Sequence, residues 1–115
     1  MVEKTQIIGA PVPPVAWLVI RTGHRTGRDY RLGTQTTIGR DAMSCDLILD
    51  DEAVSAEHAR IKRERGQFVL YDLASTNGTS LNGKRIQRVP LVDGDTITIG
   101  ISELVFKEIG NPQTG

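Results

Sequence analysis

The side chains best suited to chemistry lie in three polar segments between short apolar runs. Arg40 ends the run Ile38-Gly39-Arg40, Ser55 follows in a second segment, and Thr76 and Asn77 lie in a third. An arginine presents a planar, always charged fork of N–H donors that matches the oxygens of a phosphate group. A serine hydroxyl and the N–H groups of a loop can supply further donors. These residue types favour local binding of an oxyanion.

The same sequence gives no support for catalysis, a metal or a cofactor. We find no nucleophile paired with a base and no pair of carboxylates. Cys45 and the two histidines lack the spacing of zinc ligands. Residues 78–85 nearly spell a nucleotide-binding P-loop, but Arg85 replaces the Ser or Thr that would hold magnesium, and no helix signal follows. We therefore expect a binding protein rather than an enzyme, with no cofactor.

Composition narrows the class of protein. The chain has 115 residues, which fits one domain, and its 14 basic and 14 acidic side chains cancel. No bulk field therefore draws it to nucleic acid or to a membrane. The longest apolar run, Val15 to Ile20, is too short to span a bilayer, and the single Cys45 fits a reducing compartment. We expect a cytoplasmic protein, or a soluble module of a larger one, that binds neither nucleic acid nor membrane.

Short strands must position the polar segments. No window carries apolar residues at helical spacing, whereas many short runs are bounded by Gly, Asn, Asp and Pro. Asn82-Gly83 predicts a tight hairpin, because both turn positions favour positive φ. The runs predicted as strands include residues 17–20, 30–32, 36–38, 46–49, 58–61, 68–71, 96–99 and 104–106. About ten or eleven such strands predict an all-β antiparallel sandwich.

The pattern also predicts how the chain is organised. Residues 15–109 are expected to form the folded unit, between a proline-rich N-terminal tail at 1–14 and a C-terminal tail at 110–115. Three stretches stay irregular: 39–46, 49–57 and 72–79. Loops of a sandwich gather at its two ends, so three polar loops at one end would make a functional rim.

The order of these motifs resembles that of the forkhead-associated (FHA) family, bacterial type. Gly39-Arg40 is followed by Ser55-x-x-His58 and then by Asn77-Gly78, and the similarity covers residues 16–108. The flanking sequence also resembles that of the family, notably at residues 46–51 and 71–79. The resemblance implies a non-enzymatic β-sandwich that binds phosphothreonine in a partner protein, within bacterial Ser/Thr kinase signalling.

The resemblance also implies which residues bind. Arg40 and Ser55 would hold the phosphate, and Thr76 would add a contact near the phosphothreonine. Asn77 would hydrogen-bond the backbone of the bound peptide. A different class of function is a scaffold that binds unphosphorylated protein surfaces through a sheet face, with Arg40 serving a structural purpose.

Other positions either match the family framework or depart from its pattern. Gly39, His58 and Gly78 resemble supporting residues: His58 would brace the loops and Gly78 would allow a tight turn. Ala56 stands where members often have Asn, Arg or Lys, so one phosphate donor is missing. Ala53 matches a position that reads the third residue after the phosphothreonine, and an alanine there implies an apolar preference.

The N-terminal tail is a candidate ligand. Related bacterial FHA regulators are phosphorylated on N-terminal threonines by Ser/Thr kinases, and Thr5 is the corresponding candidate here, with Ile8 three residues after it. The alternative is a plain disordered tail. Ten residues separate Thr5 from Val15 and reach at most about 33–36 Å. Because termini in this family lie far from the binding loops, we expect capture of a phosphorylated tail between molecules, giving self-association.

Overall fold

The computed structural model describes residues 15–23 and 25–110, and within them the chain forms eleven strands. No helix in this part of the chain is long and apolar enough to cross a membrane. The strands are β1 (Val15–Thr22), β2 (Asp29–Arg31), β3 (Gln35–Gly39), β4 (Leu47–Ile48), β5 (Ala59–Glu64), β6 (Gln67–Asp72), β7 (Thr79–Leu81), β8 (Lys84–Ile86), β9 (Arg88–Pro90), β10 (Thr96–Ile99) and β11 (Ser102–Ile109).

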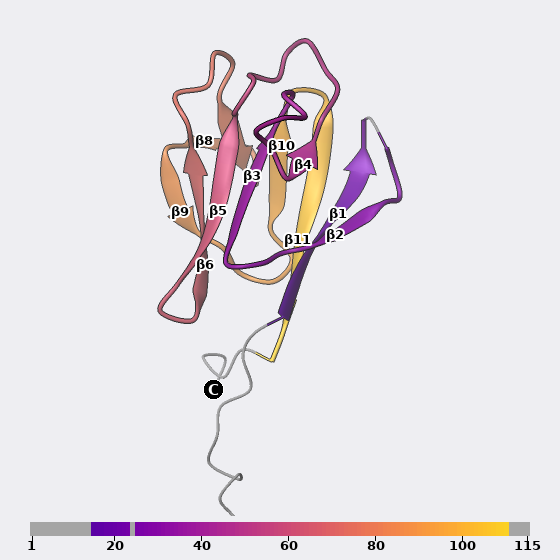
Figure 1. The fold of residues 1–115 in the computed structure, drawn as a ribbon. Helices are drawn as coiled ribbons and strands as arrows, with labels where there is room; N and C mark the ends of the chain where they lie inside the picture. Colours follow the sequence, from indigo (N-terminus) through magenta and orange to yellow (C-terminus); the bar gives the residue numbers. More distant parts are fainter. Residues whose placement is uncertain (1–14, 24, 111–115) are drawn as a thin grey trace, which may run out of the picture.

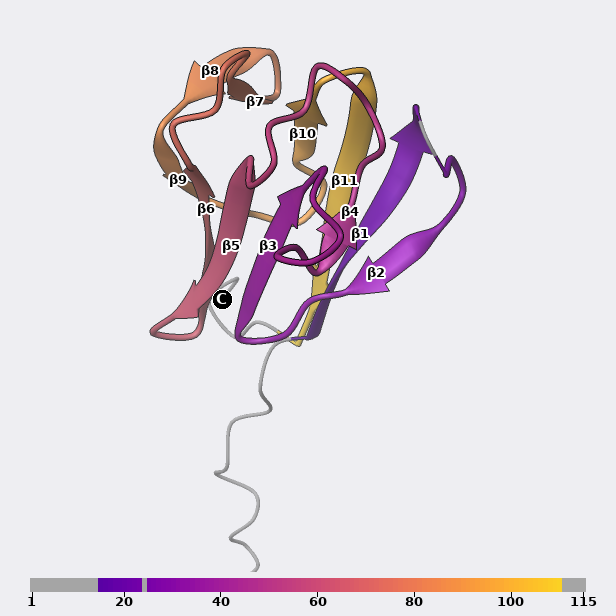
Figure 2. The same cartoon turned by 45° about the horizontal axis from the view of Figure 1, so that its top comes forward.

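The strands form two sheets that face each other, as Figures 1 and 2 show. The six-stranded sheet has the order β2-β1-β11-β10-β7-β8, and the five-stranded sheet has the order β4-β3-β5-β6-β9. The predicted β-sandwich is therefore confirmed. One pairing differs from the antiparallel expectation: β3 and β4 run parallel. Asp46 holds this bridge in place, because its carboxylate accepts from Thr37 N at 2.8 Å and its own N–H donates to Thr37 O at 2.8 Å.

The core lies between the sheets and follows from the two-residue period of the strands. In β1 and β11 alternate residues are buried, and the same holds for β10. Phe68 of β6 and Phe106 of β11 meet edge to face across the sandwich, with ring centroids 5.7 Å apart. Such a pair adds about 0.5–1.5 kcal/mol to the burial of the rings. The largest fully buried side chains are Phe68, Phe106, Leu18, Ile20, Ile38, Leu49, Ile61, Leu70, Leu91, Ile97, Ile99 and Leu104.

The predicted hairpin at Asn82-Gly83 is confirmed. Both residues have positive φ, 50° for Asn82 and 87° for Gly83, and they join β7 directly to β8. The Asn82 amide also donates to Asp95 at 2.9 Å and accepts from Thr96 N at 2.9 Å. The turn is therefore fixed to the start of β10.

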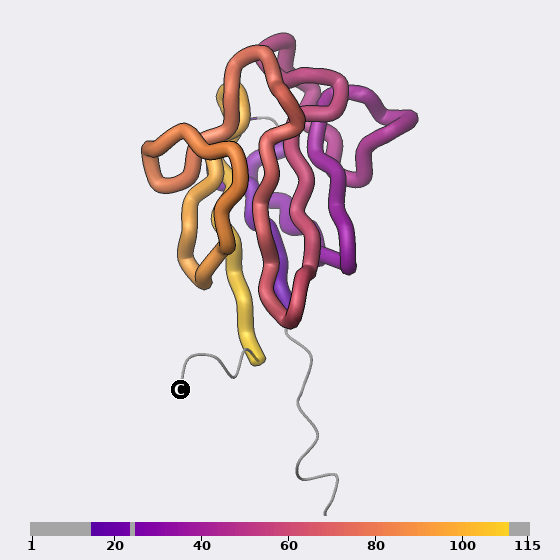
Figure 3. Tube along the Cα trace, turned by 90° about the vertical axis from the view of Figure 1, so that its left-hand side faces the viewer, coloured from indigo at the N-terminus to yellow at the C-terminus, as the bar shows by residue number. Residues whose placement is uncertain are grey.

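Three connections meet at one end of the sandwich. We call them the first loop (residues 40–46, after β3), the second loop (49–58, after β4) and the third loop (73–78, after β6). Figures 1 and 3 show all three at the same end, with the start of β1 and the end of β11 at the other. The prediction that the irregular stretches share one end is confirmed.

Candidate functional site

The second loop crosses directly over the end of β3 at Gly39. A Cβ added to Gly39 would lie 2.3 Å from the carbonyl oxygen of Ala56 and 2.8 Å from Cys45 Sγ. The Cys45 thiol donates to that same carbonyl at 3.0 Å, and burial raises the pKa of the thiol, so it stays protonated. Only glycine fits between these groups. Gly39 thus allows the close approach of the second loop, and the residue that follows it, Arg40, lies where the first and second loops meet.

Arg40 is held by the second loop from both its backbone and its side chain. Its N–H donates to Ser55 O at 3.1 Å, and its Nε donates to Val54 O at 2.9 Å. Among residues 15–23 and 25–110 no carboxylate forms an ion pair with Arg40, so its terminal N–H groups face solvent. A depression of about 350 Å³ lies beside it, lined by Arg40, Asp41, Ala42 and Ala56.

Asp41, which also lines this depression, has its carboxylate engaged within the first loop. One oxygen accepts from Met43 N at 3.0 Å and the other from the Ser44 hydroxyl at 2.9 Å. These hydrogen bonds, from the Met43 backbone first, lower the pKa of Asp41 below its ordinary value. The carboxylate is thus turned to its own loop.

Ser55 and Asn77 join the second loop to the third. The N–H of Thr76 donates to Ser55 Oγ at 3.1 Å, and Asn77 Nδ2 donates to Ala53 O at 2.9 Å. Because the Ser55 hydroxyl accepts through a lone pair, its own hydrogen remains available to donate. The Oδ1 of Asn77 has no hydrogen-bond partner in the part of the chain that the structure describes. The four predicted binding residues, Arg40, Ser55, Thr76 and Asn77, are therefore linked at one place.

His58 is fully buried beneath this place and connects three segments. Its Nδ1 accepts from Ser55 N at 3.0 Å, so the ring proton is on Nε2, which donates to the Gly78 carbonyl at 2.8 Å. Its backbone N–H donates to Ile38 O at 2.8 Å, and its carbonyl accepts from Leu73 N at 2.9 Å. One side chain thus fixes the spacing between the second and third loops.

Asp72, which sequence reasoning did not single out, closes the third loop. Its carboxylate accepts from the Ser75 hydroxyl at 2.5 Å, from Ser75 N at 3.1 Å and from the Thr79 hydroxyl at 2.7 Å. Burial alone would raise the pKa of Asp72, but the hydrogen bonds from Ser75 and Thr79 outweigh it and lower the pKa. The sequence signal was the Asp three residues before a Ser, a spacing at which short polar side chains bond local backbone.

Gly78 ends the third loop in a conformation that favours glycine, with φ at 89°. Its N–H donates to the Ser75 hydroxyl at 2.9 Å. The guanidinium of Arg85 lies against it, since a Cβ at Gly78 would be 2.4 Å from Arg85 Nε. The turn, the Ser75 bond and the bond to His58 together set the path of the loop.

Asp51 is a second residue that sequence reasoning missed, and it anchors the second loop to the opposite sheet. Its carboxylate accepts from Ile101 N at 2.8 Å and from Ala53 N at 2.9 Å. The bond from Ile101 and then that from Ala53 lower the pKa of Asp51. A Cβ at Gly100 would lie 2.2 Å from this carboxylate. The turn between β10 and β11 therefore supports the loop that carries Ser55.

The arrangement presents hydrogen-bond donors where the three loops meet. In residues 15–23 and 25–110 no set of three or more His, Cys, Asp or Glu side chains lies close enough to hold a metal ion. The charged fork of Arg40 and the Ser55 hydroxyl can donate to a dianion, and the Asn77 amide can accept from a peptide backbone. Thr5, the predicted phosphorylation site, lies outside the described residues.

Comparison with known proteins identifies the fold family. The family model for the FHA domain matches residues 36–100. The glycogen accumulation regulator GarA of Mycolicibacterium smegmatis is 36% identical over 91 residues, which cover 79% of this chain and 58% of GarA. The chain thus spans little more than half of that relative. The oxoglutarate dehydrogenase inhibitor of Corynebacterium diphtheriae is 36% identical over 103 residues, covering 87% of this chain and 72% of the inhibitor.

Solved structures agree with the sequence relatives. A structure from work on phosphothreonine-dependent FHA domain interactions has a TM-score of 0.74 at 35% identity, covering 81% of this chain and 95% of that one. Mycobacterium tuberculosis EmbR in complex with a low-affinity phosphopeptide has a TM-score of 0.74 at 38% identity, covering 81% of this chain and 24% of EmbR. With two facing sheets and the family model over residues 36–100, this chain belongs to the FHA domain family.

Proposed function

We propose that this chain binds a phosphothreonine-containing segment of a partner protein across the first, second and third loops. The observation that carries the proposal is the placement of Arg40 beside Ser55: Arg40 Nε is fixed by Val54 O at 2.9 Å, and the Ser55 hydroxyl keeps its hydrogen free while it accepts from Thr76 N. A phosphothreonine brings about −1.5 to −2 charges and three strong acceptor oxygens. Charge-assisted bonds from a preorganised guanidinium suit such a group.

The remaining site residues take complementary parts in this proposal. Thr76 contacts the ligand near the phosphothreonine, and Asn77 accepts a peptide N–H through Oδ1 while Ala53 O holds its amide nitrogen. Gly39, His58 and Gly78 support the loops rather than touch the ligand. The loops are braced before binding, which reduces the ordering cost of recognition.

The names of the relatives favour a regulator rather than an enzyme. GarA is named as a regulator and the corynebacterial relative as an inhibitor, and EmbR was solved with a phosphopeptide. For this chain we infer a non-enzymatic, cytoplasmic adaptor in bacterial Ser/Thr kinase signalling. Its partner is a protein that a Ser/Thr kinase has phosphorylated.

Two alanines shape the expected affinity and specificity. Ala56 lines the depression beside Arg40 and adds no side-chain donor, so phosphate binding rests on Arg40, Ser55 and backbone groups. Ala53 cannot form a salt bridge. We therefore infer a preference for an apolar residue at the third position after the phosphothreonine, which selection from an oriented phosphopeptide library measures. Strong selection of Asp at that position contradicts the inference.

We further propose that phosphorylated Thr5 is captured between molecules. The start of β1 lies at the end of the sandwich opposite the three loops (Figures 1 and 3). The ten residues from Thr5 to Val15 reach at most about 33–36 Å and would have to be nearly straight to close on their own domain. Capture in trans gives dimers or chains. Phosphorylated protein that stays monomeric while its loops become blocked to peptide contradicts this.

A titration with a fluorescent peptide that copies residues 1–12 tests the function. The peptide is made with Thr5 phosphorylated and unphosphorylated, and Arg40→Ala serves as the control. Binding of the phosphorylated form alone, lost in Arg40→Ala, supports both the phosphothreonine site and the tail as ligand. If neither form binds, a degenerate phosphothreonine library decides whether the loops bind any such peptide, and equal binding of matched unphosphorylated peptides rejects the proposal.

A further inference from the structure

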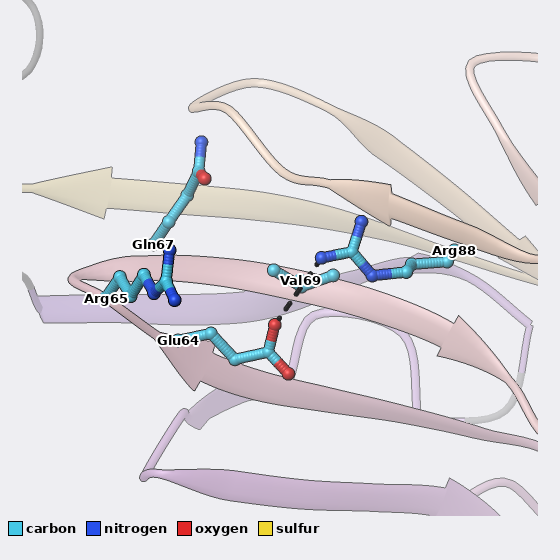
Figure 4. Close-up of a pocket in the computed structure, with 5 residues that line it drawn as sticks. All are labelled: Glu64, Arg65, Gln67, Val69 and Arg88. Carbon is cyan, nitrogen blue, oxygen red and sulfur yellow. Dashed lines mark ion pairs between the residues drawn. The ribbon is translucent and has the colours of Figure 1, made fainter.

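A second depression lies away from the three loops, on the outer face of the five-stranded sheet. It has a volume of about 630 Å³ and is lined by Glu64, Arg65, Gln67, Val69 and Arg88 (Figure 4). Val69 faces out of the sheet, because its neighbours Phe68 and Leu70 belong to the core. It is nevertheless only 2% exposed. Figure 4 shows Arg65 and Gln67 on one side of Val69 and Arg88 on the other.

Tyr71 and Glu64 connect side chains along one wall of the depression. The Tyr71 hydroxyl donates to Glu64 at 2.5 Å, and the other Glu64 oxygen lies 3.6 Å from an Arg88 nitrogen. Lys62 Nζ and Arg88 Cζ lie 5.6 Å and 5.7 Å from the centre of the Tyr71 ring. The carboxylate of Glu64 is thus committed to neighbours, and Lys62 and Arg88 lie beside the Tyr71 ring.

This face carries more positive charge than its own carboxylates neutralise. Arg88 pairs with Glu64, and Arg60 pairs with Glu57 at 3.8 Å. Neither Lys62 nor Arg65 has a carboxylate partner among the residues that the structure describes. The whole chain has a formal net charge of zero, so the excess is local.

We propose that this lateral surface, made of Lys62, Arg65, Gln67, Val69 and Arg88, is a docking site for an acidic, unphosphorylated segment of a partner protein. Ligand carboxylates pair with Lys62 and Arg65, and Gln67 donates a side-chain N–H. Two cations without carboxylate partners among the described residues can pair with the side chains of a short acidic peptide, and the nearby Glu64 carboxylate is already paired with Arg88. The proposal rests in part on the proposed function, because the same partner presents its phosphothreonine to the three loops.

The distance between the two sites sets the spacing of the ligand. Strand β6 begins at Gln67 in the lateral surface and ends at Asp72, which closes the third loop. Five steps of about 3.3 Å give roughly 17 Å along the strand. An extended ligand must span this distance and then pass over the third loop, which takes about six to ten residues. The acidic segment therefore lies about that far from the phosphothreonine.

A set of matched peptides tests the lateral surface. Two phosphopeptides copy residues 1–12 and are extended at one end, so that four glutamates begin eight residues before phosphorylated Thr5 in one and eight residues after it in the other; four glutamines replace the glutamates in their counterparts. We expect one acidic peptide to bind wild type about 3- to 10-fold more tightly than its counterpart. The advantage disappears in Lys62→Gln/Arg65→Gln. It remains in Arg25→Gln/Lys84→Gln, which removes the same charge from an exposed left-handed turn residue and an exposed strand residue elsewhere. Equal affinities for wild type overturn the proposal.

A second measurement keeps the lateral surface separate from the phosphothreonine site. Amide NMR shifts of uniformly labelled protein are followed during titration with unphosphorylated octaglutamate, with octaglutamine as the control. We expect changes at residues 62–69 and 88 and not at Arg40, Ser55 or Thr76. This result stands even if no phosphopeptide binds. No change, or equal change around Arg25 and Lys84, overturns the proposal whatever the phosphopeptides do.

Discussion

The buried ring of His58 donates to the carbonyl of Gly78 at 2.8 Å, so the two loops that carry Ser55 and Asn77 share one support. The Nδ1 atom of the same ring accepts a hydrogen bond from Ser55 N at 3.0 Å. Because the His58 ring is fully buried, both hydrogen bonds lie inside the protein. The relative position of the second and third loops is therefore set inside the protein, before a ligand is present.

Replacing His58 with alanine should lower both stability and phosphopeptide affinity. The change leaves a cavity and two backbone groups without partners, and each unsatisfied buried group costs about 1–3 kcal/mol. His58→Gln should be milder, because its amide can still donate toward Gly78. Urea denaturation gives the free energy of unfolding and titration gives the affinity. Wild-type affinity in a folded His58→Ala protein contradicts the support described here.

Adding one methyl group at Gly39 should disrupt the site. The new Cβ would meet the Ala56 carbonyl oxygen at 2.3 Å, so the second loop must move away from β3. We expect Gly39→Ala to lose about 1–3 kcal/mol of unfolding free energy and most phosphopeptide binding. Gly33→Ala is the matched control, since a Cβ there meets nothing within 4 Å. If both variants behave like wild type, the close approach is not important.

Arg40→Ala should lower phosphopeptide affinity with little effect on stability. The side chain is exposed, and its one internal bond is from Nε to Val54 O at 2.9 Å. Loss of a charge-assisted hydrogen bond costs about 1.5–3 kcal/mol, so affinity should fall roughly 10- to 150-fold. Arg40→Lys should recover only part, because an ammonium lacks the fork of donors. Isothermal titration with Arg28→Ala as control measures the effect, and full rescue by lysine would exclude bidentate contact.

The Asp72 network should make stability depend on acid. The pKa of Asp72 is lowered from its ordinary value of 3.8, so the carboxylate binds its proton less readily in the folded protein than in the unfolded chain. The stabilisation is present above pH 4 and is lost as the pH falls through the folded-state pKa. Asp72→Asn should be less stable than wild type at pH 7, and the difference should shrink at pH 3. Urea midpoints at both pH values check this, and a constant difference would contradict it.

Strand patterning and turn chemistry carried the prediction of the fold. Short apolar runs bounded by turn residues, such as residues 17–20, predicted the strands, and Asn82-Gly83 specifies its own hairpin. The parallel bridge between β3 and β4 was not predictable in this way. It depends on hydrogen bonds between Asp46 and Thr37, which no local period reveals.

The residues of the candidate site were likewise predicted only in part. Arg40, Ser55 and Asn77 were located through the order of short motifs, and the structure brings their loops together. Asp51 was missed because its partner Ile101 is fifty residues away and approaches only once both sheets are packed. The lateral surface was missed for a similar reason, since Glu64 of β5 and Arg88 of β9 lie on either side of β6 and meet only in the assembled sheet.

The pairing of Val15 with Ile109 has a practical consequence for this sandwich. Because β1 and β11 are hydrogen-bonded neighbours, the two ends of the described chain lie close together. They lie at the end of the sandwich opposite the three loops (Figure 1). Closely spaced ends are the geometry that circular permutation and insertion into a host protein require. The three loops would face outward from either arrangement, so a permuted or inserted domain would keep the site proposed above accessible.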